Sequence, residues 1–372
     1  MSALLHKTDT HPSNGPRLDA VHPPAAMPGG EVEVIGTGLG TGNGSLPSVK
    51  IGDTQAYLSL SRPQRAIVRV PEGAISGDLV FTTVDSAKHE HASNPLELSV
   101  AVPMAESLHP VSNPAVDADG SVFATVSGPR GQSVEVSIFS IARDFQMRPF
   151  VRDLLNATGL AFGPDGYLYA SSRAEGTVYR ISPEGAMSTY AEGMGIATGI
   201  AFDAEGNLYV GDRSGTIFKV GPDRGRTSAS GDPVTDREIF VYATLEPSVS
   251  AYHLAFNDEG VLFVTGPTTS SSQSIYAIDR DGKTSVFYHG LGRAQGMAFD
   301  VEGNLYVAAS LHGQRGIVKI TPQRGASLAL AGNNLVGLAF LEDGCATLAT
   351  KDALYHVSLG IEGRKLVGPL SR

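Results

Sequence analysis

The sequence predicts an all-β protein of two domains, a small Ig-like β-sandwich followed by a six-bladed β-propeller. Three observations support this prediction. The 372 residues include 44 glycines and no tryptophan, a composition that favours many turns. One pattern recurs six times between residues 105 and 362. Residues 17–101 do not share that period, so they are expected to form a separate domain.

The repeat is anchored on a glycine that follows an acidic or polar pair. These glycines are Gly120, Gly166, Gly206, Gly260, Gly303 and Gly344. An apolar run such as GIAF precedes each turn, an alternating run such as NLYVG follows it, and a third strand such as TIFKV and a weaker fourth complete most units. Three or four strands per repeat are typical of a propeller blade, and a blade buries its faces only against neighbours in a ring.

The acidic pairs also suggest calcium loops, because DADG at 117–120 resembles half of one. A calcium loop needs further oxygen ligands that a lone D-x-D-G does not supply. The alternative is a structural turn, in which glycine adopts positive φ and the preceding Asp or Asn bonds the local backbone. All six repeats have a polar turn here, so the structural turn is the prediction.

Residues 17–101 contain short strands separated by Gly and Pro turns, the pattern of a small β-sandwich. Pro23 and the blocks PGGEVEVIGTGL (28–39), VKIGDTQA (49–56) and VPEGAISGDLVF (70–81) resemble an IPT/TIG immunoglobulin-like domain. That resemblance implies a non-catalytic spacer or interaction module. Residues 1–16 are predicted to be a disordered leader, and residues 363–372 a tail or closing strand.

Composition excludes several classes of function. The formal net charge of −10 argues against nucleic acid as a partner, since neutralising phosphates requires clustered Lys and Arg. No apolar run reaches the roughly 20 residues of a membrane span. A single cysteine, Cys345, leaves no internal disulfide and no Cys-based metal site.

Without a visible secretory signal the default compartment is the cytoplasm, and export stays open if the sequence begins after a processed region. Nothing indicates an oligomeric state.

The repeats, above all TGIAFDAEGNLYVGDRSGTIFKV (198–220), resemble NHL repeats. They are also similar to the senescence-marker-protein/gluconolactonase family of six-bladed propellers. The second resemblance implies one divalent cation (Ca, Mg or Zn) in the central tunnel. Glu, Asn and Asp at the starts of the innermost strands would hold it, and lactone hydrolysis would be the activity.

Those ligand positions are occupied differently in this sequence. They hold Ser112, Thr158, Thr198, Tyr252, Gln295 and Val336. None is a carboxylate, and hard divalent cations prefer charged oxygen ligands. We therefore predict no catalytic residues and no cofactor, with the tunnel cation as the alternative. Asn113 and His253 stand one place further on, and His253 replaces the usual glycine. They would enter the tunnel if the alignment slipped by one residue.

A basic rim is predicted on the face that carries the strand starts. The loops between second and third strands of the repeats hold Arg130, Arg173, Arg213, His312, Arg315 and Lys351. Asp212 precedes Arg213 and is assigned to the same face. A concave site with convergent polar groups is the default ligand site, and a basic rim attracts anions. The favoured interpretation is that these cations pair with Glu175, Asp212 and Asp352 on neighbouring blades, and an anion site is the alternative hypothesis.

The sequence thus favours a non-catalytic binding protein. Its propeller face would recognise a small polar or anionic molecule, or a segment of a partner protein. The alternative is a metal-dependent, gluconolactonase-like hydrolase or another propeller hydrolase or lyase.

Overall fold

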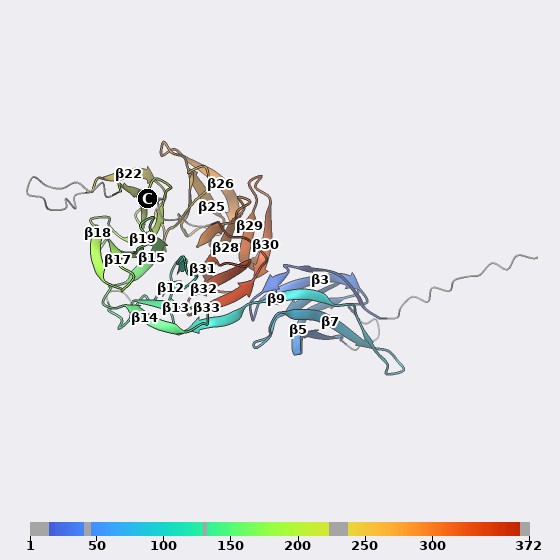
Figure 1. The fold of residues 1–372 in the computed structure, drawn as a ribbon. Helices are drawn as coiled ribbons and strands as arrows, with labels where there is room; N and C mark the ends of the chain where they lie inside the picture. The colour runs from blue at the N-terminus through green and yellow to red at the C-terminus, as the bar shows by residue number, and fades with distance from the viewer. Residues whose placement is uncertain (1–14, 41–45, 129–131, 223–236, 365–372) are drawn as a thin grey trace, which may run out of the picture.

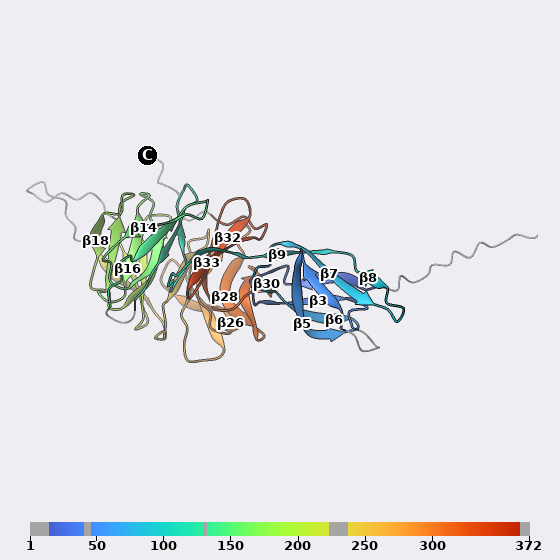
Figure 2. The same cartoon turned by 90° about the horizontal axis from the view of Figure 1, so that it is seen from below.

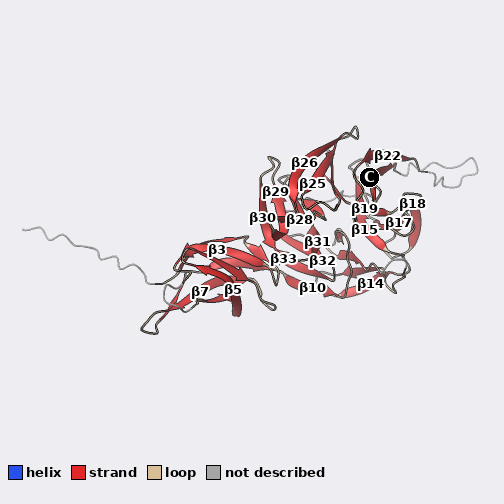
Figure 3. Ribbon diagram, turned by 180° about the vertical axis from the view of Figure 1, so that it is seen from behind, coloured by secondary structure: helices blue, strands red, loops and turns tan. Residues whose placement is uncertain are grey.

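A computed structural model describes residues 15–40, 46–128, 132–222 and 237–364. The regular structure of these residues consists of β-strands, and they contain no helix (Figure 3). Most of the expected leader and tail therefore lies outside the described ranges. Within them, no helical segment has the length and apolarity that a membrane crossing needs. The N-terminal strands lie to one side of a ring of sheets (Figure 1).

The ring contains five separate four-stranded antiparallel sheets. Four of them follow the chain in simple order. They are β11 (Ala115–Val116), β12 (Val122–Thr125), β13 (Ile138–Ile141) and β14 (Met147–Val151); β15 (Ala157–Phe162), β16 (Leu168–Ser172), β17 (Thr177–Ile181) and β18 (Met187–Ala191); β19 (Ala197–Phe202), β20 (Leu208–Asp212), β21 (Thr216–Val220) and β22 (Ile239–Thr244); and β23 (His253–Phe256), β24 (Leu262–Thr265), β25 (Gln273–Ile278) and β26 (Thr284–Leu291).

The fifth separate sheet closes the ring. Its inner strands are β31 (Leu335–Phe340), β32 (Cys345–Thr350) and β33 (Ala353–Ser358), and its outer strand is β10 (Val102–Glu106), which pairs antiparallel with β33. The closing strand therefore comes from the N-terminal side of the repeats, and it begins three residues before the expected domain start. Gly363 and Arg364 instead lie against Asp300 and Phe299, and the rest of the expected tail is outside the described residues.

A large mixed sheet of 13 strands joins the two parts of the molecule. One end holds β27 (Met297–Phe299), β28 (Leu305–Leu311), β29 (Gln314–Ile320) and β30 (Ala326–Ala331), paired in the same order as the other repeats. The two-residue strand β2 (Ala25–Ala26) runs parallel to β30 on one side and to β9 (Leu96–Val100) on the other. The views in Figures 1 and 2 both place β9 near β30, and β2 pairs with each of them.

The remaining N-terminal strands surround one core. They are β1 (Arg17–His22), β3 (Glu31–Thr37), β4 (Ser48–Ile51), β5 (Thr54–Arg62), β6 (Arg65–Arg69), β7 (Gly77–Val84) and β8 (Glu90–Ala92). The order β1-β3-β6-β5 is antiparallel, and β5 continues through β4 to β7 and β9. Alternate residues such as Val32, Val34, Val68 and Phe81 point into this core. The expected strands of residues 17–101 are therefore present.

The acidic–Gly turns form as predicted. All six anchor glycines have positive φ, from 72° at Gly344 to 82° at Gly206. In the turn before β20, one Asp203 carboxylate oxygen accepts the backbone N–H groups of Glu205 and Asn207. The other accepts the side chains of Asn207 and Tyr209. The Asp203 carboxylate is thus bonded within its own turn, as the prediction of a structural turn requires.

The innermost strands approach one another closely around the axis of the ring. A Cβ on Gly159 would collide with the carbonyl of Thr198, and one on Gly199 with the carbonyl of Tyr252. A Cβ on Gly337 would lie 2.6 Å from the Asn113 side-chain oxygen. Glycine at these positions thus allows the innermost strands of neighbouring repeats to approach with their backbones in contact.

Candidate functional site: a pocket at the propeller face

A small cavity of about 100 Å³ opens where four repeats meet. Its lining comprises Val111, Thr158, Arg173, Thr198, Arg213, Val249, Ser250 and Ala251. It brings together two of the predicted strand-start residues and two of the predicted rim arginines. The residues of 249–251 were not expected. They belong to the link before β23, where the sequence has no motif that signals a site.

Arg173 and Arg213 occupy equivalent positions in consecutive repeats. The backbone N–H of Arg173 donates to the Asn156 carbonyl, two residues before Thr158, and that of Arg213 donates to Ile196, two residues before Thr198. Each arginine therefore stands beside the threonine of its own repeat. The repeat pattern explains the arrangement, since both loops follow the second strand of a blade and return to the same face.

The charge of Arg213 is not neutralised by an ion pair within the described part of the chain. Its guanidinium donates to the carbonyls of Ser248 (3.5 Å) and Val249 (3.2 Å). Asp212 is buried and accepts the Ile196 N–H at 2.8 Å and the Ser214 hydroxyl. The expected pairing of the rim cations with carboxylates on neighbouring blades is therefore not seen for Arg213 among the described residues.

Among the other residues expected to form cation–carboxylate pairs, some bond to other groups and one pair forms. Arg173 donates to the Gly128 carbonyl at 3.3 Å, and Glu175 accepts the Tyr179 hydroxyl. Lys351 and Asp352 do pair, at 3.8 Å, with both side chains exposed, where such pairs contribute about 0–1 kcal/mol.

The two threonines are almost fully buried, each 1% exposed. The Thr158 hydroxyl donates to the Asn156 carbonyl at 3.0 Å. The Thr198 hydroxyl donates to the Gly211 carbonyl at 2.8 Å and accepts the Tyr252 N–H at 3.1 Å. Because their protons are used, these oxygens can form further hydrogen bonds only as acceptors, and both residues belong to the pocket lining.

The pocket wall formed by residues 249–251 is held in place by bonds to two neighbouring repeats. The Ser248 hydroxyl and the Val249 N–H both donate to the Pro267 carbonyl, and the Ser248 N–H donates to Arg213. Ser250 follows with its N–H bonded to the Ser248 hydroxyl, while its own hydroxyl has no protein partner among the described residues. The pocket thus has a fixed wall with one available hydroxyl.

Other predicted site residues hold the ring together instead of lining the pocket. Ser112 donates to the Thr158 carbonyl at 2.6 Å, and Gln295 donates to the Leu335 carbonyl at 3.0 Å. Asn113 joins two repeats, donating to Met297 O at 2.8 Å and accepting Leu338 N–H at 3.1 Å. The Tyr252 hydroxyl donates to the Glu246 carbonyl.

The predicted rim does not close into one site. His312 is exposed in the hairpin between β28 and β29, with φ of 51°. Arg315 is exposed at the start of the same hairpin's second strand. Neither lines the pocket. Arg130 lies outside the described residues. Two arginines, not a complete ring of cations, therefore define the basic side of the pocket.

His253 is the most unusual ionisable group near the axis. It is 3% exposed, and its Nε2 has no hydrogen-bond partner within the described ranges. Burial lowers the pKa of the imidazole to about 3, so it is neutral at physiological pH. It pairs through the backbone with Thr265 in β24.

The strand-start residues do not fit a divalent cation. Ser112, Thr158 and Thr198 direct their hydroxyl protons at backbone carbonyls, and both ends of the Asn113 amide are engaged. The described residues contain no group of three His, Cys, Asp or Glu side chains placed to hold a metal. A cation that requires charged oxygen ligands therefore lacks them here.

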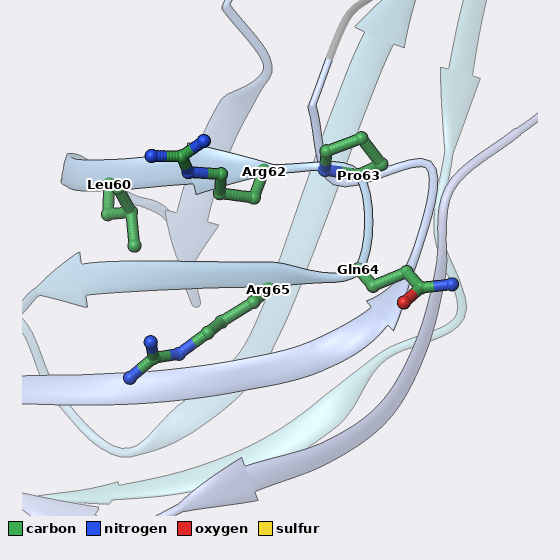
Figure 4. Close-up of a pocket in the computed structure, with 5 residues that line it drawn as sticks. All are labelled: Leu60, Arg62, Pro63, Gln64 and Arg65. Atoms are coloured by element: carbon green, nitrogen blue, oxygen red, sulfur yellow. The ribbon is translucent and has the colours of Figure 1, made fainter.

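A second hollow, of about 620 Å³, lies far from the propeller axis in the N-terminal module. Figure 4 shows that it is lined by Leu60 and Arg62 from one strand, Pro63 and Gln64 at the turn, and Arg65 on the next. Its described lining residues all come from a single hairpin, and Arg65 is paired with Glu33. Convergent groups from several elements distinguish the propeller pocket from this one.

Sequence comparisons give no assignment. No protein-family model matches the chain. No curated protein matches it either.

Comparison with solved structures gives many matches. A structural-genomics protein provisionally assigned as a gluconolactonase has a TM-score of 0.55 and 18% identity, over 72% of this chain and 94% of that one. A gluconolactonase from Xanthomonas campestris has a TM-score of 0.50 and 15% identity, over 70% and 89%. An auxiliary nutrient binding protein from Bacteroides ovatus has a TM-score of 0.50 and 11% identity, over 94% and 98%. At such identities these likenesses show the fold alone: the protein is an all-β propeller, structurally similar to gluconolactonases and to a nutrient-binding protein.

Proposed function

We propose that this protein binds a small polar molecule in the propeller pocket and carries out no chemistry on it. The observation that carries the proposal is the lining, which combines two arginines with two buried threonines and has no carboxylate among its described residues. Concave sites with a few convergent polar groups are the usual form of a ligand site. The cavity of about 100 Å³ suits a small molecule better than a segment of a partner protein.

We also infer a finer architecture. The strands β27–β30 act as the sixth blade, since they pair in the same order as the other repeats and carry the same acidic–Gly turn. Residues 17–101 form an Ig-like module. Its support is the antiparallel order of its strands around one core.

Blocking the pocket tests the proposed function. Ser250 lines the cavity, so Ser250→Leu would fill it. The control Ser327→Leu places the same side chain at an exposed position of β30. The ligands are lactate, propionate, lactamide, glycerol and inorganic phosphate, measured by isothermal titration. We expect at least one to bind the wild type and the Ser327→Leu variant but not Ser250→Leu. Absence of binding to the wild type, or equal binding to both variants, would refute the proposal.

A gluconolactonase-like hydrolase remains the second candidate, favoured by the fold likeness to gluconolactonases. It predicts lactone turnover that increases with added Ca²⁺, Mg²⁺, Mn²⁺ or Zn²⁺. The strand-start residues argue against it, because their hydroxyls and amides are engaged with backbone groups. Metal-dependent turnover lost in both Asn113→Ala and His253→Ala would replace the binding proposal with this one.

A further inference from the structure

We infer that the pocket selects a small carboxylate with a hydroxyl or amino group on the neighbouring carbon. This inference rests on the proposed function and names the class of ligand. It combines three features of the lining: two positive charges, threonine oxygens whose protons are already used, and a volume that limits the ligand to a few heavy atoms.

The first feature is charge. Arg173 and Arg213 both line the cavity, and none of the other described lining residues is acidic. The Arg213 guanidinium bonds only to backbone carbonyls among the described residues, and carbonyls do not cancel its charge. Guanidinium groups bind carboxylates through charge-assisted hydrogen bonds, often in pairs. The basic side of the pocket therefore favours an anion.

The second feature is the direction of the threonine hydrogen bonds. A hydroxyl has one proton to donate and two lone pairs to accept with. The protons of Thr158 and Thr198 go to the carbonyls of Asn156 and Gly211. Any further hydrogen bond to these oxygens must be one that they accept, and Thr198 already accepts one from Tyr252 N–H. An anion alone gains nothing from them, whereas a ligand O–H or N–H can donate to Thr158.

The third feature is size. A volume of about 100 Å³ equals that of roughly three water molecules at ~30 Å³ each. Val111 and Ala251 add apolar wall between the polar groups. A carboxylate, a neighbouring carbon with its donor group and one further carbon meet these limits. A 2-hydroxy or 2-amino acid of about three carbons is such a molecule.

Three compounds of similar size separate the features. Lactate has the carboxylate and the hydroxyl, propionate lacks the hydroxyl, and lactamide lacks the charge. We expect lactate to bind the wild type about fivefold more tightly than propionate, from one net hydrogen bond of about 1 kcal/mol. Lactamide is expected to bind at least about tenfold more weakly than lactate, because it loses the charge-assisted bonds.

Variants connect each preference to its residue. Arg213→Gln is expected to weaken lactate and propionate by a similar factor and to leave lactamide nearly unchanged, while Arg315→Gln, an exposed rim arginine outside the pocket, changes none of them. Thr158→Val is expected to remove the preference for lactate over propionate, and Thr158→Ser to keep it. Circular dichroism of each variant establishes that the fold is intact.

The outcomes distinguish this inference from the proposed function. Equal affinity for lactate and propionate overturns the donor requirement, equal affinity for lactate and lactamide overturns the charge requirement, and tighter binding of inorganic phosphate overturns the carboxylate. In each of those cases, loss of binding in Ser250→Leu still supports a ligand pocket. If none of the compounds binds the wild type, both the inference and the proposed function are wrong.

Discussion

His253 is a buried ionisable residue, and we expect it to make the free energy of unfolding depend on pH. The positions equivalent to it in four other repeats are Gly159, Gly199, Gly296 and Gly337, where a side chain would collide with the next strand. The imidazole at this position is fully buried, and burial lowers its pKa to about 3. The folded state therefore favours the neutral imidazole, because burial is the cause of the lowered pKa.

The free energy of unfolding should depend on His253 in acid. Its folded pKa of about 3 lies below the unfolded value of 6.5, so below pH 6.5 only the unfolded state takes up the proton. This contribution is complete above pH 6.5 and is lost as pH falls towards 3, at up to ~1.4 kcal/mol per pH unit. We expect His253→Gln to lose less stability than the wild type between pH 7 and 4.5. Urea unfolding followed by circular dichroism measures the difference, and parallel pH profiles would contradict it.

The residues of the pocket were partly predictable from the repeat alone. Equivalent positions in a repeat share a face, so Thr158, Thr198, Arg173 and Arg213 were expected together, and they line one cavity. The hydrogen bonds of Ser112, Asn113, Tyr252 and Gln295 to neighbouring repeats were not predictable. Ser112, Asn113, Gln295 and the backbone N–H of Tyr252 each bond to a partner far away in sequence, and periodicity contains no information about such partners.

At the scale of the strand, the inner glycines control how closely the repeats pack. A Cβ on Gly296 would collide with the Asn113 side-chain oxygen and lie 2.6 Å from Gly337 Cα. Asn113 in turn bridges Met297 and Leu338. The first and last repeats are thus joined by side-chain bonds at the axis and, on the outside, by β10 pairing with β33.

Gly296→Ala should therefore destabilise the ring. Neither the Gly337 backbone nor the doubly bonded Asn113 can move without losing contacts, and overpacking of this kind costs about 1–3 kcal/mol. Gly221→Ala is the matched control, because the nearest atom to its added Cβ, Glu238 O, is 3.9 Å away. Thermal unfolding should show a lower Tm for the first variant and little change for the second. Equal Tm values would mean that the inner strands adjust freely.

The strand pattern predicted most elements but not the two that connect distant parts of the chain. Alternation and turn glycines indicated the strands of each repeat, and the six anchor glycines have the positive φ expected. The closing strand β10 and the connecting strand β2 are short and carry no repeat signal. Their places are set by partners at 353–358 and 331, which sequence periodicity cannot identify.

At the scale of the molecule, the N-terminal module and the propeller share a core. Ala25, Met27 and Ala101 pack with Tyr306, Ile317 and Leu330 of the β27–β30 strands. Hydrogen bonds from Met27 N–H to Ala331 O (2.8 Å) and from the Asn333 side-chain amide to Gly29 O (3.2 Å) cross the same boundary. A flexible spacer would have few such contacts, so we expect the two parts to behave as one cooperative unit.

This cooperativity can be tested at Met27. Its side chain is 3% exposed and lies against Gly332 and Leu335, so Met27→Asp would bury an unpaired carboxylate between the two parts. Ile75→Asp is the control, since Ile75 is 63% exposed on the same module.

Hydrogen exchange in the wild type should give β3 and β28 the same opening free energy, because both open only when the whole chain unfolds. Met27→Asp should lower that of β3 below that of β28, while the control shifts neither by more than about 0.5 kcal/mol. If β3 already opens independently in the wild type, the shared core does not couple the module to the propeller, and ligand binding at the far pocket could not be transmitted to the module through it.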